Sequence, residues 1–183
     1  MTTLAADEIR SRVETDWNRI VKVLAEKVAL QSISAKGITA EQMKRSAEFV
    51  ADELRLVGVD TKVVQASNAD GTPGAWEVIG SHIVSPDALT VLLYAHHDVQ
   101  PVPDPAEWNT DPFVATEIDG RLYGRGSADG GGGVAHPCTG CSRPCTVTST
   151  QVLPRSEVVK EGMSADQLPE SATIITSAAN SSR

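Results

Sequence analysis

The apolar run LTVLLYA, from Leu89 to Ala95, constrains the fold of this chain more than any other segment. A strand that is apolar on both faces is typical of a parallel sheet covered by helices. The run leads directly into His96, and Asp98 follows two residues later. Sites in α/β proteins gather just beyond the C-terminal ends of such strands. We therefore expect an α/β domain, with helices packed on a mostly parallel sheet and a site at this strand end.

Two amphipathic helices are predicted before this run. Apolar residues recur at helical spacing from about Ala5 to Ala29, at Ile9, Val13, Trp17, Ile20, Leu24 and Val28. A second helix is expected after Thr39, which forms a capping-box pattern with Gln42, and its buried stripe comprises Met43, Ala47, Val50, Leu54 and Val57. Gly58 is placed to end this helix.

Two short strands are predicted between the second helix and the apolar run. Residues 61–64, TKVV, and residues 76–79, WEVI, have the β-branched and aromatic content of strands. The Asp70-Gly71 pair between them is a turn signal.

Charge and hydropathy exclude several classes of partner. The formal net charge of -8 argues against nucleic acid and against an anionic membrane surface, because both need a basic face. The sequence shows no secretory signal, and its longest apolar run is too short to span a bilayer. We expect a cytoplasmic protein whose cysteines form no structural disulfides.

The composition changes abruptly after Gly133. All seven aromatic residues precede Gly124, whereas the segment from Val134 to Arg183 has none and is rich in Ser and Thr. A segment without bulky apolar groups gains too little from burial to offset the entropy of ordering. We therefore expect a domain over residues 1–133 and a low-order tail over residues 134–183.

The tail contains His136, Cys138, Cys141 and Cys145 within one short stretch. These four side chains could close a structural zinc site. Zinc sites usually have two separated pairs of ligands, however, and this pattern matches them weakly. An accidental cluster is the favoured interpretation.

The segment Tyr94-Ala95-His96-His97-Asp98-Val99 carries a candidate metal ligand. A strand that ends here presents an imidazole and, two residues on, a carboxylate to the same side. Metal-bound histidines usually donate their second ring N–H to such a group. An isolated H-x-D pattern would still be more often a surface loop than a site.

A second motif, DGRLYGRGSAD, ends at Asp129. Its glycines allow close backbone approach, and the terminal carboxylate has two oxygens that can bridge two cations. Neither a P-loop nor a complete dinucleotide fingerprint is present. Ser127 also lacks the flanking glycines of a serine-hydrolase elbow.

Together, YAHHDVQP, then Trp108 and Asp111-Pro112-Phe113, then DGRLYGRGSAD resemble the zinc-dependent dipeptidase, aminoacylase and carboxypeptidase family of metallopeptidases. The resemblance covers the chain from about Leu4 to Gly133 and is closest to the dipeptidase branch. It implies that this part of the chain is the N-terminal part of a zinc-peptidase catalytic domain.

The resemblance implies a role for three residues. His96 would bind one zinc, Asp129 would bridge two zincs, and Asp98 would be the catalytic aspartate that orients His96; His97 occupies a variable position. The two zinc ions, for which cobalt or manganese could substitute, would activate a water that attacks a small peptide substrate. In the family a Glu-Glu pair supplies the general base, and no Glu-Glu pair occurs in this sequence.

A further departure follows the bridging aspartate, where the family usually has an acidic residue and this chain has Gly130. One hypothesis is a disrupted reading frame near residues 130–135; a truncation followed by an unrelated tail is the competing explanation. Two functional interpretations follow. The chain is either a metal-dependent hydrolase of dipeptides or related N-acyl amino acids, truncated and inactive in this form, or a non-catalytic α/β fragment with at most a weak partial metal site.

Several other side chains are expected to have structural roles. His82 is interpreted as a loop residue, Trp108 and Phe113 as packing residues of the loop between the motifs, and Arg125 as a support for the glycine turn.

Overall fold

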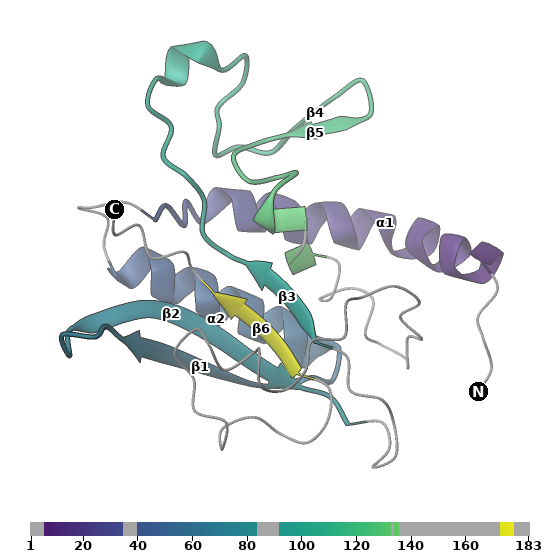
Figure 1. Ribbon diagram of the computed structural model, residues 1–183. Helices are drawn as coiled ribbons and strands as arrows, with labels where there is room; N and C mark the ends of the chain where they lie inside the picture. Colours follow the sequence, from purple (N-terminus) through teal and green to yellow (C-terminus); the bar gives the residue numbers. More distant parts are fainter. Residues whose placement is uncertain (1–5, 35–39, 84–91, 133, 136–172, 178–183) are drawn as a thin grey trace.

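The computed structural model describes residues 6–34, 40–83, 92–132, 134–135 and 173–177. Figure 1 shows helices on one side of a sheet and a separate hairpin above α1. The elements in chain order are α1 (Ala6–Ala29), α2 (Ala40–Leu56), β1 (Asp60–Ser67), β2 (Pro73–Ser81), β3 (Leu93–His96), a 3-10 turn η1 (Pro105–Glu107), β4 (Thr116–Ile118), β5 (Arg121–Tyr123) and β6 (Thr173–Ser177). Each helix and strand predicted before His96 is present, so the α/β class is confirmed.

Helix α2 ends as its sequence predicts. Gly58 has a φ of 87°, a left-handed conformation that glycine adopts without strain. The Gly58 N–H donates to the Arg55 carbonyl, and the Val59 N–H donates to the Leu54 carbonyl. This pair of bonds is the Schellman motif, which turns the chain sharply into β1. The Thr39 cap predicted for the other end lies outside the described residues.

The strand directions correct the expectation of a mostly parallel sheet. The order is β1-β2-β6-β3, and only the β3–β6 pair is parallel, whereas β1–β2 and β2–β6 are antiparallel. Strands β1 and β2 flank the predicted Asp70-Gly71 turn, and two strands joined by so short a connection must run in opposite directions. The Asp70-Gly71 turn therefore predicts the antiparallel β1–β2 pair correctly, whereas the apolar run wrongly suggested a mostly parallel sheet.

The core lies between the sheet and the two helices. It combines residues of α1, α2, the strands and the segment after Asp129, namely Val23, Ala47, Val50, Ala51, Leu54, Val57, Val59, Val78, Ala95, Val134 and Ala135. Burial of the α2 stripe at Ala47, Val50 and Leu54 is confirmed. Because both helices contribute to one core, they cover the same face of the sheet (Figure 1).

The opposite face of the sheet is open in the described part of the chain. Successive side chains of a strand point to opposite faces. On β3, Ala95 is buried toward the helices, whereas its neighbour Tyr94 is 62% exposed. The expectation that residues 89–95 are buried on both faces is therefore wrong at Tyr94, because no described helix covers that face; residues 89–91 lie outside the described residues.

Helix α1 is buried over only part of its predicted stripe. Val23 and Val28 are buried, but Val13 and Trp17 are 41% and 55% exposed. The N-terminal half of α1 extends beyond the strands, so it has no sheet to pack on (Figure 1). The helix itself forms as expected.

Part of the segment expected to be a low-order tail belongs to the domain. Residues 130–132 and 134–135 are helical, and Val134 and Ala135 are buried in the core. Further along, β6 lies between β2 and β3 and pairs with both. The structured part of the chain thus does not stop at Gly133. Within the described residues, no helix is long and apolar enough to cross a membrane.

Candidate metal centre

His96 is the last residue of β3, and the irregular segment of residues 97–99 follows it. We call residues 96–99 the turn. The side chain of Asp98 lies behind the imidazole and is 3% exposed. The His96 Nδ1–H donates to an Asp98 carboxylate oxygen at 3.1 Å, and the Asp98 backbone carbonyl lies at the same distance. The buried carboxylate therefore fixes the orientation of the ring and places a proton on Nδ1.

The other ring nitrogen of His96 faces Asp129. His96 Nε2 lies 3.3 Å from Asp129 Oδ1, and the Asp129 side chain is 75% exposed. The structure thus brings together the three residues that the sequence analysis selected. Asp129 comes from a segment 33 residues after His96, and His96 lies between the two carboxylates. Their assigned roles remain predictions.

The two carboxylates favour a positive charge at His96. Partial burial lowers the pKa of His96, but the hydrogen bond to Asp129 and the interactions with Asp98 outweigh burial, so the pKa lies above its usual value. Without a metal, the proton on Nε2 bonds to Asp129. A metal cation would take the place of that proton.

A glycine-rich turn carries Asp129 to this position. Gly126 has a φ of 80°, and the Gly131 N–H donates to the Gly126 carbonyl at 3.1 Å. Gly130 lies directly against His96: a Cβ at this position would come within 2.4 Å of the His96 carbonyl oxygen and 2.6 Å of Nδ1. Gly130, which stands where the family usually has an acidic residue, therefore lets the backbone pack closely against His96. No cis peptide bond occurs in the described part of the chain.

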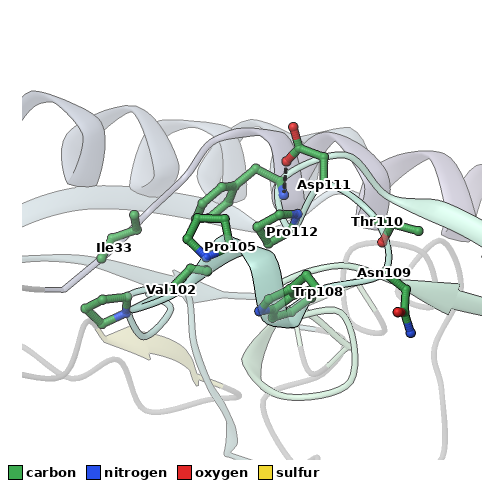
Figure 2. Close-up of a pocket in the computed structure, with 10 residues that line it drawn as sticks. Ile33, Val102, Pro105, Trp108, Asn109, Thr110, Asp111 and Pro112 are labelled. Atoms are coloured by element: carbon green, nitrogen blue, oxygen red, sulfur yellow. Dashed lines mark hydrogen bonds between the residues drawn. The ribbon is translucent and has the colours of Figure 1, made fainter.

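The loop between the two motifs forms an open pocket of about 610 Å³ (Figure 2). Trp108 and Phe113 line this pocket together with Ile33, Pro101, Val102, Pro105, Asn109, Thr110, Asp111 and Pro112. The Asp111 carboxylate accepts a hydrogen bond from the Phe113 N–H at 2.8 Å, which closes the turn there. The Arg125 guanidinium lies 5.0 Å from the centre of the Trp108 ring, so Arg125 contacts this loop, whereas its expected support of the glycine turn stays a prediction.

His82 has the expected loop position, and its Nδ1 donates to the Gly58 carbonyl at 3.0 Å. The cluster of His136, Cys138, Cys141 and Cys145 lies outside the described residues, so its zinc-site interpretation stays untested.

Sequence reasoning missed a group of buried polar residues behind the site: Lys27, Ser32, Ser46 and His97. His97 was interpreted as a variable position, although it is fully buried. One signal was available for Lys27, because it follows Val23 and Leu24 at helical spacing and therefore lies on the buried side of α1.

Comparison with known proteins identifies the lineage of this arrangement. Residues 92–139 match the model of peptidase family M20/M25/M40. This part of the chain resembles part of an M20-family peptidase domain. The match includes His96, Asp98 and Asp129 and continues six residues beyond Gly133, where the sequence alone placed its end.

Individual relatives support this assignment. The chain is 35% identical over 131 residues to a cysteinylglycine-S-conjugate dipeptidase of Corynebacterium striatum, covering 71% of this chain and 28% of that protein. It is 31% identical over 135 residues to the human Beta-Ala-His dipeptidase, covering 70% and 27%. The chain thus matches less than a third of the length of these relatives.

Solved structures share the fold. Human carnosine dipeptidase 1 superposes with a TM-score of 0.62 at 24% identity, covering 90% of this chain and 32% of that one. The dipeptidase Dug1p from Saccharomyces cerevisiae gives 0.63 at 16% identity, covering 91% and 33%. This chain therefore shares the fold of about a third of each of these two proteins.

Proposed function

We propose that this chain carries one half of the metal centre of a dinuclear hydrolase that acts on dipeptides or related N-acyl amino acids. The observation that carries the proposal is the position of His96 between a buried carboxylate, Asp98, and an exposed one, Asp129. The substrate class comes from the dipeptidases that the chain resembles, and a cytoplasmic location remains part of the same proposal.

The distance between His96 and Asp129 fits a shared cation. Two ligands held at about 2.0–2.1 Å from one tetrahedral zinc lie about 3.3 Å apart. The measured distance from His96 Nε2 to Asp129 Oδ1 is 3.3 Å. The imidazole and carboxylate also form a donor set that zinc accepts, and cobalt or manganese could substitute. These two residues would hold the ion, which would supply an activated water.

The exposure of Asp129 suits a bridging role. One of its oxygens faces His96, and the side chain is largely accessible, so its other oxygen can reach a second cation. Asp98 is buried and already bonded to Nδ1, so it serves to orient the ligand.

The same residues limit what this chain does by itself. No group of three or more metal-binding side chains occurs in the described part of the chain. Tight zinc binding needs three or four protein ligands. The sequence also lacks the Glu-Glu pair that supplies the general base in the family. We therefore propose that the isolated chain binds one ion weakly and has no turnover.

A direct metal titration tests the site. Titration with Co²⁺, followed by calorimetry and visible absorption, is expected to show one weak site that His96→Ala removes. His82→Ala is the matched control, because it removes a histidine that lies on a loop beside Gly58. Equal binding by the unmodified chain and His96→Ala would refute the site.

Dipeptide hydrolysis with added zinc, cobalt or manganese tests the second part of the proposal. We expect no turnover above that of His96→Ala. Turnover that depends on His96 would show that the chain is a working enzyme and that its remaining ligands lie elsewhere in the sequence.

The second candidate is an α/β fragment that neither catalyses a reaction nor binds a metal ion. The observation that favours it is the open sheet face at Tyr94, which a complete domain would be expected to cover. Absence of any Co²⁺ binding would select this alternative.

A further inference from the structure

The turn that holds His96 and Asp98 rests on a cluster of buried polar side chains that the proposed metal chemistry does not use. We call Lys27, Ser32, Ser46 and His97 the support cluster. All four are buried, and they come from α1, the segment after it, α2 and the turn itself. Buried polar groups are costly unless they are bonded, so their partners explain why they are tolerated.

The support cluster holds the backbone of the turn at the carbonyl of His97. The Lys27 ammonium donates to Ser32 Oγ at 2.7 Å, and the Ser32 hydroxyl donates to the His97 carbonyl at 2.7 Å. The carbonyl belongs to the peptide between His97 and Asp98. This chain of two short bonds therefore runs from α1 to the peptide that positions Asp98.

The ring of His97 anchors the turn on its other side. His97 Nε2 lies 2.9 Å from the Trp76 carbonyl, which only accepts hydrogen bonds, so Nε2 carries a proton. The Ser46 hydroxyl lies 3.0 Å from Nδ1 of the neutral ring and 3.2 Å from the His97 carbonyl, so its one proton is shared between these two acceptors. Each polar atom of the ring thus has one partner, and the turn is bonded to both β2 and α2.

The backbone beside the support cluster closes the arrangement. The Val99 N–H donates to the Ser32 carbonyl at 2.8 Å, and the Ser34 N–H donates to the Val99 carbonyl at 3.0 Å. The residues after α1 thus pair with the residues after Asp98. Ser32 thus bonds to the turn at two points, through its hydroxyl to the His97 carbonyl and through its own carbonyl to the Val99 N–H. Displacement of Ser32 would therefore move both His97 and Val99.

A cation at Lys27 also suits the buried carboxylate of Asp98. Burial lowers the pKa of Lys27 to about 8, and the charge of Asp98 opposes this effect, so the ammonium persists at neutral pH. An apolar side chain would fill this part of the core at a lower cost. The retention of a buried lysine is explained if its bonds and charge serve the turn.

We propose that Lys27 is a positioning residue for the metal-facing histidine: its ammonium, through Ser32 and the His97 carbonyl, fixes the turn that aims His96 and Asp98. The expected effect of Lys27 on metal binding rests on the proposed function, in which His96 is a metal ligand. Groups that orient a metal ligand typically change metal affinity by about 10–100-fold when they are removed.

The test compares two variants of the cluster with a matched control. Lys27→Met removes the charge and keeps the length of the side chain, and Ser32→Ala removes the hydroxyl that links Lys27 to the turn. Lys22→Met makes the same change as the first variant at an exposed position of the same helix. Hydrogen exchange of the Val99 and Ser34 amides is measured together with Co²⁺ affinity, and the amides of β1 and β2 report on the rest of the fold.

We expect both cluster variants to speed Val99 exchange and weaken Co²⁺ binding by about tenfold or more, with protection of β1 and β2 retained. Lys22→Met is expected to change neither. Equal loss of protection at Val99 and in β1 and β2 would reduce Lys27 to a general stabiliser and overturn the proposal, as would unchanged exchange at Val99. If the unmodified chain binds no Co²⁺, the proposed function fails, while the exchange of Val99 still decides whether Lys27 holds the turn.

Discussion

The two sides of His96 differ in how completely this chain builds them. On the inner side, Asp98 is 3% exposed and lies next to the buried support cluster. On the outer side, Asp129 is 75% exposed, and within the described residues its carboxylate bonds to His96. Packing within the chain is sufficient to fix the orientation of the ligand. The outer side, which must supply further metal ligands, is incomplete in the described residues.

This difference has a physical cause. A buried polar group must find its partners when the core forms, because water cannot replace them. The members of the support cluster have such partners in the folded chain. The exposed carboxylate keeps its water shell and loses little if a partner is missing. Loss of the remaining site would thus leave the inner side folded, and mutations should affect the two sides unequally.

The largest expected effect is the loss of the buried ring of His97. His97→Ala leaves a cavity and removes the ring nitrogens that bond to Ser46 Oγ and to the Trp76 carbonyl, although Ser46 keeps its bond to the backbone carbonyl of residue 97. We expect the free energy of unfolding to fall by about 3–5 kcal/mol, measured by urea denaturation. His82→Ala, on the loop, should cost about 1 kcal/mol or less. A similar cost for the two variants would contradict the comparison.

The same ring should make stability depend on pH. Burial, the largest cause, lowers the pKa of His97 to about 4, although its bond to the Trp76 carbonyl opposes the shift. The unfolded chain takes up this proton near pH 6.5 and the folded chain only near pH 4. The contribution is therefore fully present above pH 6.5 and is lost as the pH falls from 6.5 to 4.

That loss should amount to about 3 kcal/mol over the whole window, since one pKa unit corresponds to about 1.4 kcal/mol. The measurement is the free energy of unfolding of the unmodified chain and of His97→Gln at several pH values. The difference between the two should shrink as the pH falls through this window. A constant difference would show that His97 titrates alike in both states.

Gly130 lies where the inner and outer sides meet, and a side chain there should have an intermediate effect. The added Cβ of Gly130→Ala would overlap the carbonyl and ring of His96. We expect a loss of about 1–3 kcal/mol in stability and weaker Co²⁺ binding. Gly132→Ala is the control, because its Cβ would come no closer than 3.5 Å to Ser127 O and alanine favours a helix. Destabilisation by Gly132→Ala as large as that by Gly130→Ala would refute the specific contact with His96.

The smallest expected effect on stability is at the outer carboxylate. Asp129→Asn changes an exposed side chain and should alter the free energy of unfolding by about 0.5 kcal/mol or less. Asp98→Asn makes the same change in a buried position and should cost more, because it replaces the buried negative charge that accepts the His96 Nδ1–H with a neutral amide. Both variants should weaken Co²⁺ binding, so titration and denaturation together separate a ligand from a group that orients it.

The sequence predicted local features well where one short-range cause acts alone. The α2 stripe and the Gly58 end depend on helical spacing and on the freedom of glycine at positive φ. The β1–β2 hairpin depends on its turn. The Asp119-Gly120 pair carried a similar signal for the β4–β5 hairpin, and Asp119 and Gly120 do adopt φ values of 50° and 73°. That signal was overlooked.

Other features were decided by contacts between distant segments. The exposure of Tyr94 depends on which elements cover the sheet, and the insertion of β6 beside β3 joins segments far apart in sequence. Neither follows from the composition of the strand itself. The tail was predicted from composition alone, which cannot show that a short piece of it completes a sheet.

For this protein, then, the sequence by itself determined the α/β class and the elements before His96, because local periodicity carries that information. The three residues that meet at the candidate site were predicted from motifs that resemble those of a known peptidase family. Only the tertiary structure decided which carboxylate is buried, how closely Gly130 approaches His96 and which groups support the turn. The physical reason is that Lys27, Ser32, Ser46 and His97 carry no local pattern in common. They become one cluster only when the two helices close over the sheet and exclude water from them.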